Sequence, residues 1–295
     1  MQASAALHHH RRAWEGVSRQ FLRFFVFIDA LSLAAPLVAV IWQLSLVRAF
    51  QLRASRLEPV VLALAIWTLY AADHVLDALR GMSSFWEPTR KTFYRLHWRT
   101  MATVASCTGL ASLALAVCSL RRSTLLSGVA IGAFVFAYFL FVHMLPLRWR
   151  GLWPREAVVA LGFSLGTFVP LMPSRAIPPL AGSVQAIVFF LLCWLNCCAV
   201  ETWEWQRSGC PSEQRPHVST RWNARHLAVL AIIVGTGALV AARWLGRGNE
   251  FGLGGFSSGI ALYLLAQNQS LLPDSILGIS ADLALCVPAL FLGLR

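Results

Sequence analysis

Long apolar runs alternate with short polar segments along this chain, and most runs are close to the length of a membrane span. About 20 consecutive apolar residues in a helix cross the hydrocarbon core of a bilayer. The runs that reach or approach this length lie at 20–47, 57–79, 98–119, 123–145, 155–173, 183–205, 225–245, 251–268 and 271–293. The pattern predicts an all-α, polytopic membrane protein with about nine transmembrane helices.

No polar linker divides this series of runs, so we expect a single transmembrane helical domain at 20–295. Residues 1–19 are polar and basic and lack the apolar core of a cleaved signal, so we interpret them as a retained cytoplasmic leader. The run at 251–268 contains the glycine-rich stretch FGLGGFSSGI. Small residues of this kind favour close packing between helices in lipid.

The composition supports this fold class and argues against one competing function. The chain is 57% hydrophobic and 13% charged, with a mean hydropathy of +0.62. Its net charge of +12 would suggest nucleic-acid binding in a soluble protein. Here the arginines fall in short loops between apolar runs, where the positive-inside rule and anionic lipid headgroups explain them. We therefore expect membrane lipids, and no nucleic acid, as partners.

The distribution of basic residues also predicts an orientation. With nine alternating spans, arginine and lysine are more frequent on the side of the N-terminus, which places that end in the cytoplasm. We expect an integral protein of a bacterial inner membrane. The seven cysteines lie mostly inside apolar runs, where packing is favoured over disulfides or zinc binding.

Two acidic motifs end two of the predicted helices, far apart in the sequence. Asp73 and Asp77 are four residues apart, so a helix places both carboxylates on one face. Asn196, Glu201 and Glu204 end the later helix. In a nine-span topology both helices cross the membrane in the same direction, so both motifs are predicted to reach the same, cytoplasmic, face.

Acids at membrane depth require a physical reason. A charged side chain at the bilayer centre costs about 2.5–3.5 kcal/mol on insertion scales, so such residues usually line a cavity or pair with another group. Carboxylate and amide oxygens suit Mg²⁺, which keeps several waters and bridges to substrate phosphates, and arginine binds phosphates in bidentate fashion. We predict Mg²⁺ ligands at Asp73, Asp77, Asn196, Glu201 and Glu204, of which Asp73, Asp77 and Glu201 are the candidate catalytic residues, and diphosphate contacts at Arg80, Arg148, Arg150 and Arg155. With an apolar wall for a hydrocarbon tail, a lipid diphosphate fits all parts.

Simpler interpretations stay open for individual residues. Asp77 and Arg80 could form an ordinary interfacial ion pair, which contributes little on its own. Two motifs at the same depth and on the same side favour a functional site over two such pairs. Asp29 and Asp282 are lone intramembrane acids that either hydrogen-bond within the bundle or contact the cavity, and the sequence does not distinguish these options.

The helix number and the two motifs resemble the UbiA superfamily of intramembrane prenyltransferases. The basic segment that leads from Tyr138 into PREAVVALGFSLG is also similar to that family. The resemblance implies that both acidic motifs bind Mg²⁺ and a polyprenyl diphosphate. It further implies that ionisation of the diphosphate gives an allylic cation, which an aromatic or quinone-type acceptor captures inside a bundle that excludes water.

The sequence departs from the family pattern at three positions. The first family motif reads N-D-x-x-D-x-x-x-D, and here Leu69 and Tyr70 stand at its first two positions. Cys197 stands at the first position of the second motif, which usually reads D-x-x-x-D. These departures favour an alternative function, a non-catalytic UbiA-like protein that binds lipids or acts as a scaffold. A transporter with proton coupling at Asp73 or Glu201 is a third class, although the two halves share little internal repetition.

Overall fold

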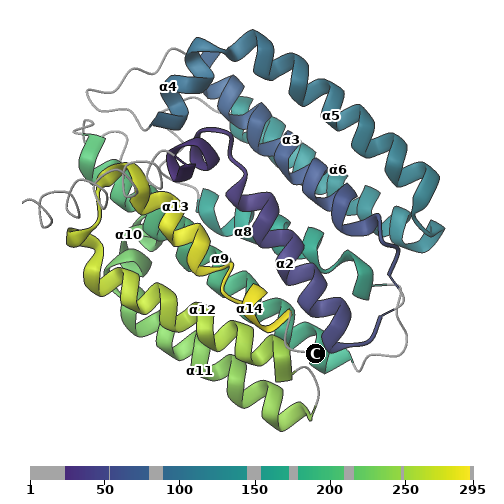
Figure 1. The fold of residues 1–295 in the computed structure, drawn as a ribbon, viewed down its shortest axis with the longest axis vertical. Helices are drawn as coiled ribbons and strands as arrows, with labels where there is room; N and C mark the ends of the chain where they lie inside the picture. Colours follow the sequence, from purple (N-terminus) through teal and green to yellow (C-terminus); the bar gives the residue numbers. More distant parts are fainter. Residues whose placement is uncertain are drawn as a thin grey trace, which may run out of the picture.

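The computed structural model describes residues 24–52, 54–79, 89–144, 154–172, 179–208, 216–246 and 249–292. Within these ranges the chain forms helices and loops and no strand, which confirms the all-α prediction (Figure 1). The elements are α2 (Ala34–Ala49), α3 (Glu58–Leu79), α4 (Thr89–Leu96), α5 (Trp98–Ser119), α6 (Arg122–Met144), α8 (Arg155–Thr167), η1 (Val169–Leu171), α9 (Pro179–Ser208), α10 (Val218–Arg225), α11 (Leu227–Leu245), α12 (Asn249–Asn268), η3 (Gln269–Leu271), α13 (Asp274–Ala284) and α14 (Ala289–Leu292).

Each of the nine predicted segments contains a helix, but fewer helices have the length and apolarity of a membrane span. Five qualify among the residues described, namely α3, α5, α6, α9 and α11, or six if a bent pair near the N-terminus is one span. At 13 and 11 residues, α8 and α13 are too short, and the 20-residue α12 does not meet the criterion either. The chain is therefore an integral membrane protein by these criteria, with five or six candidate spans.

The first predicted helix, 20–47, is not continuous. The segment Phe24–Ala30 and α2 meet at an angle of 88°. Ser32 lies in the left-handed region with a φ of 54°, which a helix interior does not allow. Pro36 lies in the first turn of α2, where its missing N–H leaves no helical hydrogen bond unmade.

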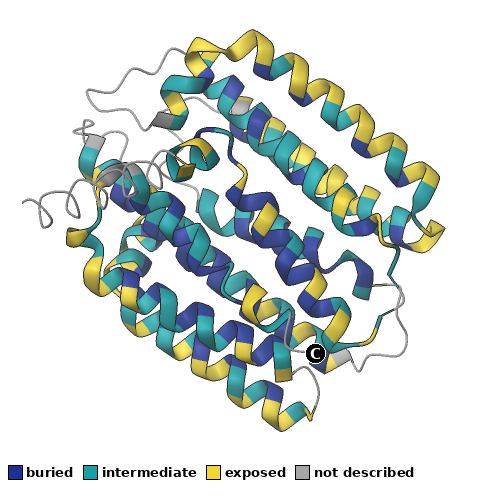
Figure 2. Ribbon diagram, in the orientation of Figure 1, coloured by how far each residue is buried: buried dark blue, intermediate teal, exposed yellow. Residues whose placement is uncertain are grey.

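The core lies where α2 crosses the centre of the molecule. Trp42 is fully buried and donates from Nε1 to the carbonyl oxygen of Leu285 at 2.8 Å. Its ring centroid lies 4.6 Å from that of Phe189 on α9 and 4.8 Å from that of Phe251 on α12. Figure 2 shows buried residues concentrated in α2 and its neighbours, and exposed residues along the outer side of α5. The exposed apolar side chains of α5, such as Leu110 and Val117, are suited to contact with lipid.

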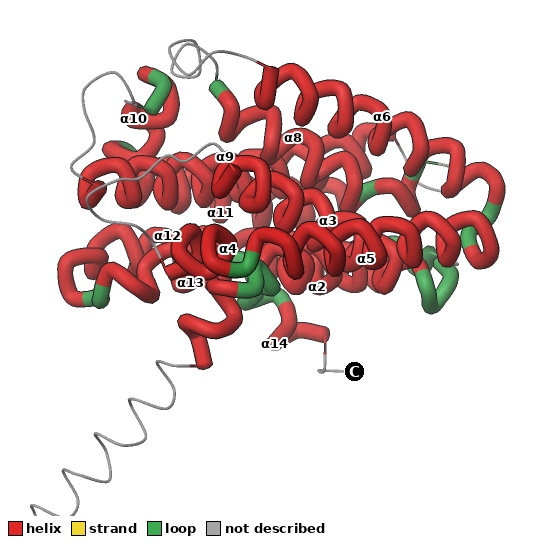
Figure 3. Tube along the Cα trace, turned by 90° about the horizontal axis from the view of Figure 1, so that it is seen from above, coloured by secondary structure: helices red, strands yellow, loops and turns green. Residues whose placement is uncertain are grey.

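The glycine-rich helix packs as the sequence predicts. A Cβ atom on Gly259 of α12 would lie 2.6 Å from the carbonyl oxygen of Ala231 on α11, and one on Gly252 would lie 2.3 Å from the Cβ of Ala242. Only glycine allows the two helices to approach so closely. In Figures 1 and 3 this helix pair forms one end of the molecule, and α3, α5 and α6 form the other.

The polar segments that follow the two acidic motifs contain helices. The segment 80–97 includes α4, and 207–224 includes most of α10. Each short helix buries one side, since Tyr94 of α4 and Thr220 of α10 are fully buried. Polar and basic residues dominate both segments, so only contact with the bundle reveals which few side chains are buried and hold each helix in place.

Candidate functional site

A cavity of about 1320 Å³ lies between α3, α5, α6, α8 and α9. Residues of α3 line it from Glu58 to Ala78, which corresponds to about 30 Å along a helix. That length is close to the thickness of the hydrocarbon core of a bilayer. The cavity therefore has the dimensions of an elongated amphiphile rather than those of a small polar metabolite.

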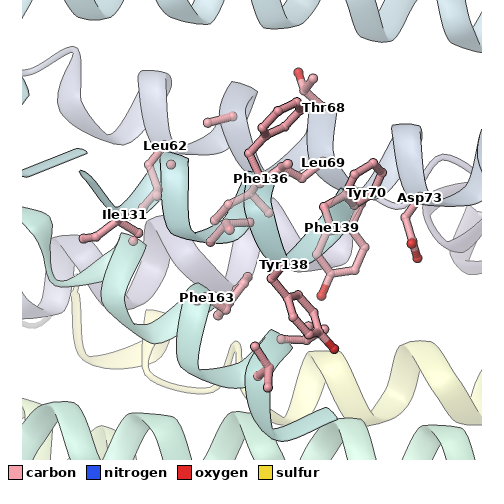
Figure 4. Close-up of a pocket in the computed structure, with 18 of the residues that line it drawn as sticks. Leu62, Thr68, Leu69, Tyr70, Asp73, Ile131, Phe136, Tyr138, Phe139 and Phe163 are labelled. Carbon is pink, nitrogen blue, oxygen red and sulfur yellow. The ribbon is translucent and has the colours of Figure 1, made fainter. Parts of the chain in front are cut away.

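Most of the cavity wall is apolar. Figure 4 shows Leu62 and Leu69 of α3, Ile131 and Phe136 of α6 and Phe163 of α8 around the same space. Glycines widen the cavity on the α6 side: no atom lies within 4 Å of the position that a Cβ would take on Gly128 or Gly132. This wall can accept a long hydrocarbon chain, as the sequence predicts.

One end of the cavity is charged, and both acidic motifs reach it. The five residues predicted as Mg²⁺ ligands all line this one cavity, namely Asp73, Asp77, Asn196, Glu201 and Glu204. The i,i+4 spacing on α3 turns Asp73 and Asp77 to the same side. Glu201 is exposed, and its side chain opens into the cavity. The packing of α3, α8 and α9 thus brings together residues that are far apart in the sequence.

Arg155 is the predicted diphosphate contact that the structure describes. It is the first residue of α8, and its Nη2 donates to Asp73 Oδ2 at 2.8 Å. The side chains remain partly exposed, at 33% for Arg155 and 24% for Asp73. Both groups can therefore contact a ligand in the cavity without complete separation of the pair. Arg80, Arg148 and Arg150 lie outside the described residues, and their roles stay predictions.

A second ion-pair network covers the charged end from α4. Arg90 contacts Glu204 at 3.1 Å and Asp29 at 3.6 Å, and Lys91 lies 3.5 Å from Glu204. Burial alone would lower the pKa of Arg90, but the negative charges of Glu204 and Asp29 raise it by more than burial lowers it, so the net pKa is above its ordinary value. Arg90 is consequently a permanent cation at the charged end of the cavity, which we call the rim. Of the two interpretations left open for Asp29, the structure supports pairing within the bundle.

Arg90 and Lys91 of α4 line the same end of the cavity. A signal for them exists in the sequence: in TRKTFYRL the aromatic pair Phe93 and Tyr94 follows the basic pair by one helical turn. Tyr94 packs in a cluster with Val75 of α3, which holds the helix across the end of the cavity. Only this packing shows that the basic pair faces the acids of α9.

Two further acids line the cavity in defined hydrogen bonds. Asn196 donates from Nδ2 to Asp282 Oδ1 at 2.7 Å. Glu156, in the first turn of α8, accepts a hydrogen bond from the Thr220 hydroxyl at 2.7 Å, and an acid at this helix end is also favoured by the helix dipole. Asn196 thus contacts a carboxylate deeper in the cavity as well as being a candidate metal ligand.

The fit of Mg²⁺ depends on how these oxygens are grouped. Among the residues described, no three His, Cys, Asp or Glu side chains lie close enough together to hold a metal ion by themselves. Mg²⁺ is often held by one or two carboxylates and completed by waters and substrate phosphates, so paired acids suffice. Besides Glu58 at the start of α3, six described acids and four described arginines and lysines line the cavity. A phosphorylated ligand would add more negative charge, which a divalent cation offsets.

Comparison with known proteins gives no match for this chain. No protein-family model, no curated protein and no solved structure matches the chain. The fold and the site define it as an all-helical integral membrane protein with a largely apolar cavity that ends in a cluster of acidic and basic side chains. Any finer assignment depends on the geometry of the cavity and on the resemblance of its motifs.

Proposed function

We propose that the protein binds a polyprenyl diphosphate in this cavity and transfers the prenyl group to a lipophilic acceptor, of aromatic or quinone type, within the membrane. One observation carries the proposal: an apolar cavity about as long as a bilayer core ends in a rim where two distant acidic motifs meet arginines. A nine-span UbiA-type bundle in a bacterial inner membrane, with the N-terminus in the cytoplasm, belongs to the same proposal.

Each part of the rim has a role in this reaction. Asp73 and Asp77 on α3, or Glu201 and Glu204 on α9, would each offer a pair of acids to Mg²⁺, with waters and the phosphates of the ligand completing its coordination, and Asn196 is a further candidate. Bound Mg²⁺ would supply electrostatic stabilisation for the charge that develops on the departing diphosphate. Basic side chains share that task by direct contact with the phosphate oxygens, at Arg155 and at the predicted positions Arg80, Arg148 and Arg150. The apolar wall excludes water from the allylic carbon and so protects it from hydrolysis.

Turnover is the direct test. Protein in lipid nanodiscs with Mg²⁺ is assayed against a panel of prenyl diphosphates and quinone-type acceptors. Asp73→Ala and Asp77→Ala should each lower turnover by about 100-fold or more, because charge stabilisation is lost at the leaving group. Glu250→Gln, on α12 and away from the cavity, is the matched control and should retain turnover. Undiminished turnover in both aspartate variants would remove the metal assignment.

A second function is favoured by the ion pairs. Asp73 and Glu204 already have arginine partners, so the rim is held together by protein charges alone. A non-catalytic protein that binds anionic lipids would use the same arginines without a metal. Titration with geranyl diphosphate in Mg²⁺ and in EDTA separates the two: equal affinity in both, with no turnover against the panel, supports the non-catalytic protein.

A further inference from the structure

Asp282 is a carboxylate in the cavity wall that belongs to neither acidic motif. Its half-buried side chain lines the cavity and accepts a hydrogen bond from Asn196. Asp29, the other lone intramembrane acid, pairs with Arg90 and is not among the residues that line the cavity. The two acids looked alike in the sequence, but only Asp282 is available to a ligand.

Packing holds Asp282 in place. Leu277 and Ala281, on the same helix α13, are fully buried in a cluster with Leu195 and Ala199 of α9. The helix therefore presents Asp282 to the cavity from a well-packed support. A carboxylate in such a position is more than a mobile surface charge, because its direction is set by the bundle.

The pair lies below the charged rim. Asn196 precedes Glu201 by five residues on α9, which is about 7.5 Å along a helix. Tyr70 and Cys197 line the cavity as well, and Figure 4 shows the rings of Tyr70 and Phe139 facing the same space. A ligand at this depth would lie beside the head of a lipid diphosphate bound at the rim, where its chain begins.

The two polar groups have unused capacity to accept hydrogen bonds. An ionised carboxylate accepts about four, and Asn196 supplies one to Asp282. Oδ1 of Asn196 is buried and has no hydrogen-bond partner among the described residues. In an apolar wall an acceptor without a donor is costly, so a ligand that brings a donor gains affinity there.

We propose that Asp282 and Asn196 bind the hydroxyl group of a second, ring-bearing ligand. Under the proposed function this ligand is the prenyl acceptor, and to that extent the inference rests on the proposed function. A hydroxyl group fits because it donates a hydrogen bond without bringing a charge that must be desolvated. A ring fits because the aromatic side chains Tyr70 and Phe139 offer a flat apolar contact.

The test compares a phenol with its methyl ether, which has the same ring and no donor. Protein in nanodiscs is titrated with 4-propylphenol and with 4-propylanisole by isothermal calorimetry, with empty nanodiscs as the reference. The phenol should bind about tenfold more tightly or better, as expected for a hydrogen bond to a carboxylate. Asp282→Asn should reduce this preference to about twofold or less, and the matched control Asp29→Asn should keep it.

Each other result overturns the inference. Equal affinity for phenol and ether in the unmodified protein, or an unchanged preference in Asp282→Asn, removes the hydroxyl site. Tighter binding of 4-propylbenzylamine than of the phenol would replace it with a site for a cation. Geranyl diphosphate binding, measured on the same nanodiscs, separates this failure from that of the proposed function, since it depends on the rim and not on Asp282.

A labelling experiment on the unmodified protein guards against a variant that does not fold. A diazirine derivative of 4-propylphenol is photolysed in the nanodiscs, and the labelled peptides are identified by mass spectrometry. Label should fall on α13 or on the middle of α9 and should disappear when excess 4-propylphenol is present. Label confined to other helices, or label that the phenol does not displace, contradicts the site.

Discussion

Arg155 donates to Asp73 across 2.8 Å, and this contact joins the start of α8 to the charged end of α3. The same two side chains are the proposed contacts of the diphosphate and of Mg²⁺. In the absence of a ligand they therefore neutralise each other. Binding a phosphorylated ligand must redistribute this charge, which gives a prediction with a definite sign.

Asp73→Asn should have opposite effects on binding with and without metal. Removal of the carboxylate frees Arg155 and lowers the negative charge, so geranyl diphosphate should bind roughly three- to tenfold more tightly in EDTA. The gain in affinity that Mg²⁺ gives should disappear, because a metal ligand is lost. Calorimetric titrations of both proteins, with and without Mg²⁺, measure this. Glu250→Gln serves as the control, and a full Mg²⁺ response in Asp73→Asn would contradict the metal site.

The pair of Arg90 and Glu204 should contribute measurably to stability. Their side chains are only 17% and 21% exposed, so Arg90→Met removes the buried cation between Asp29 and Glu204 and should lower the free energy of unfolding by about 2–3 kcal/mol. Adding Glu204→Gln should recover part of that loss, with a coupling energy of about 1–2 kcal/mol in a double-mutant cycle.

Lys91 provides the control for that cycle. Its side chain is 48% exposed and lies 3.5 Å from Glu204, so Lys91→Met should change the free energy by less than about 1 kcal/mol. Denaturant titration in detergent micelles compares the unmodified protein with four variants, namely Arg90→Met, Glu204→Gln, the double variant and Lys91→Met. If Arg90→Met and Lys91→Met have equal effects, the rim is held by solvated charges and not by the buried pair.

The empty space at Gly132 should set how long a chain the cavity accepts. No atom lies within 4 Å of a Cβ built there, and the residue lines the cavity. Gly132→Leu should therefore fill part of the cavity and weaken binding of geranylgeranyl diphosphate by about fivefold or more, with a smaller effect on geranyl diphosphate.

Gly237→Leu is the matched control for this substitution. Gly237 also has no atom within 4 Å of its Cβ position, but it lies on α11 and does not line the cavity. Its affinities for both diphosphates should stay unchanged in the same titration. An equal loss for both chain lengths in Gly132→Leu would show that the apolar wall near α6 does not hold the chain.

The contact between α11 and α12 should tolerate no side chain at Gly259. A methyl group there would lie 2.6 Å from a backbone oxygen of Ala231, so Gly259→Ala should destabilise the protein by about 1–3 kcal/mol. Gly237→Ala, on the exposed side of α11, should be close to neutral. Thermal unfolding in detergent compares them, and similar melting temperatures would show that the two helices can separate without cost.

Much of the fold follows from the sequence because the bilayer restricts it. Apolar runs of membrane length must be helical, since backbone groups in lipid need internal partners. This reasoning locates a helix in every predicted segment and predicts the close packing at the glycines of α12. It does not distinguish a true span from a short helix such as α8 or α13, because both are apolar when they are buried in the bundle. The same reasoning does not predict the 88° angle between the segment Phe24–Ala30 and α2.

For the site, sequence alone determined the residue types and their spacing along each helix. Helical periodicity puts Asp73 and Asp77 on one face whatever surrounds them. Only the tertiary structure decided which distant groups meet: Arg155 with Asp73, Arg90 with Glu204, and Asn196 with Asp282. The reason is physical, since periodicity fixes directions within a helix, whereas the contacts between helices depend on how their side chains pack.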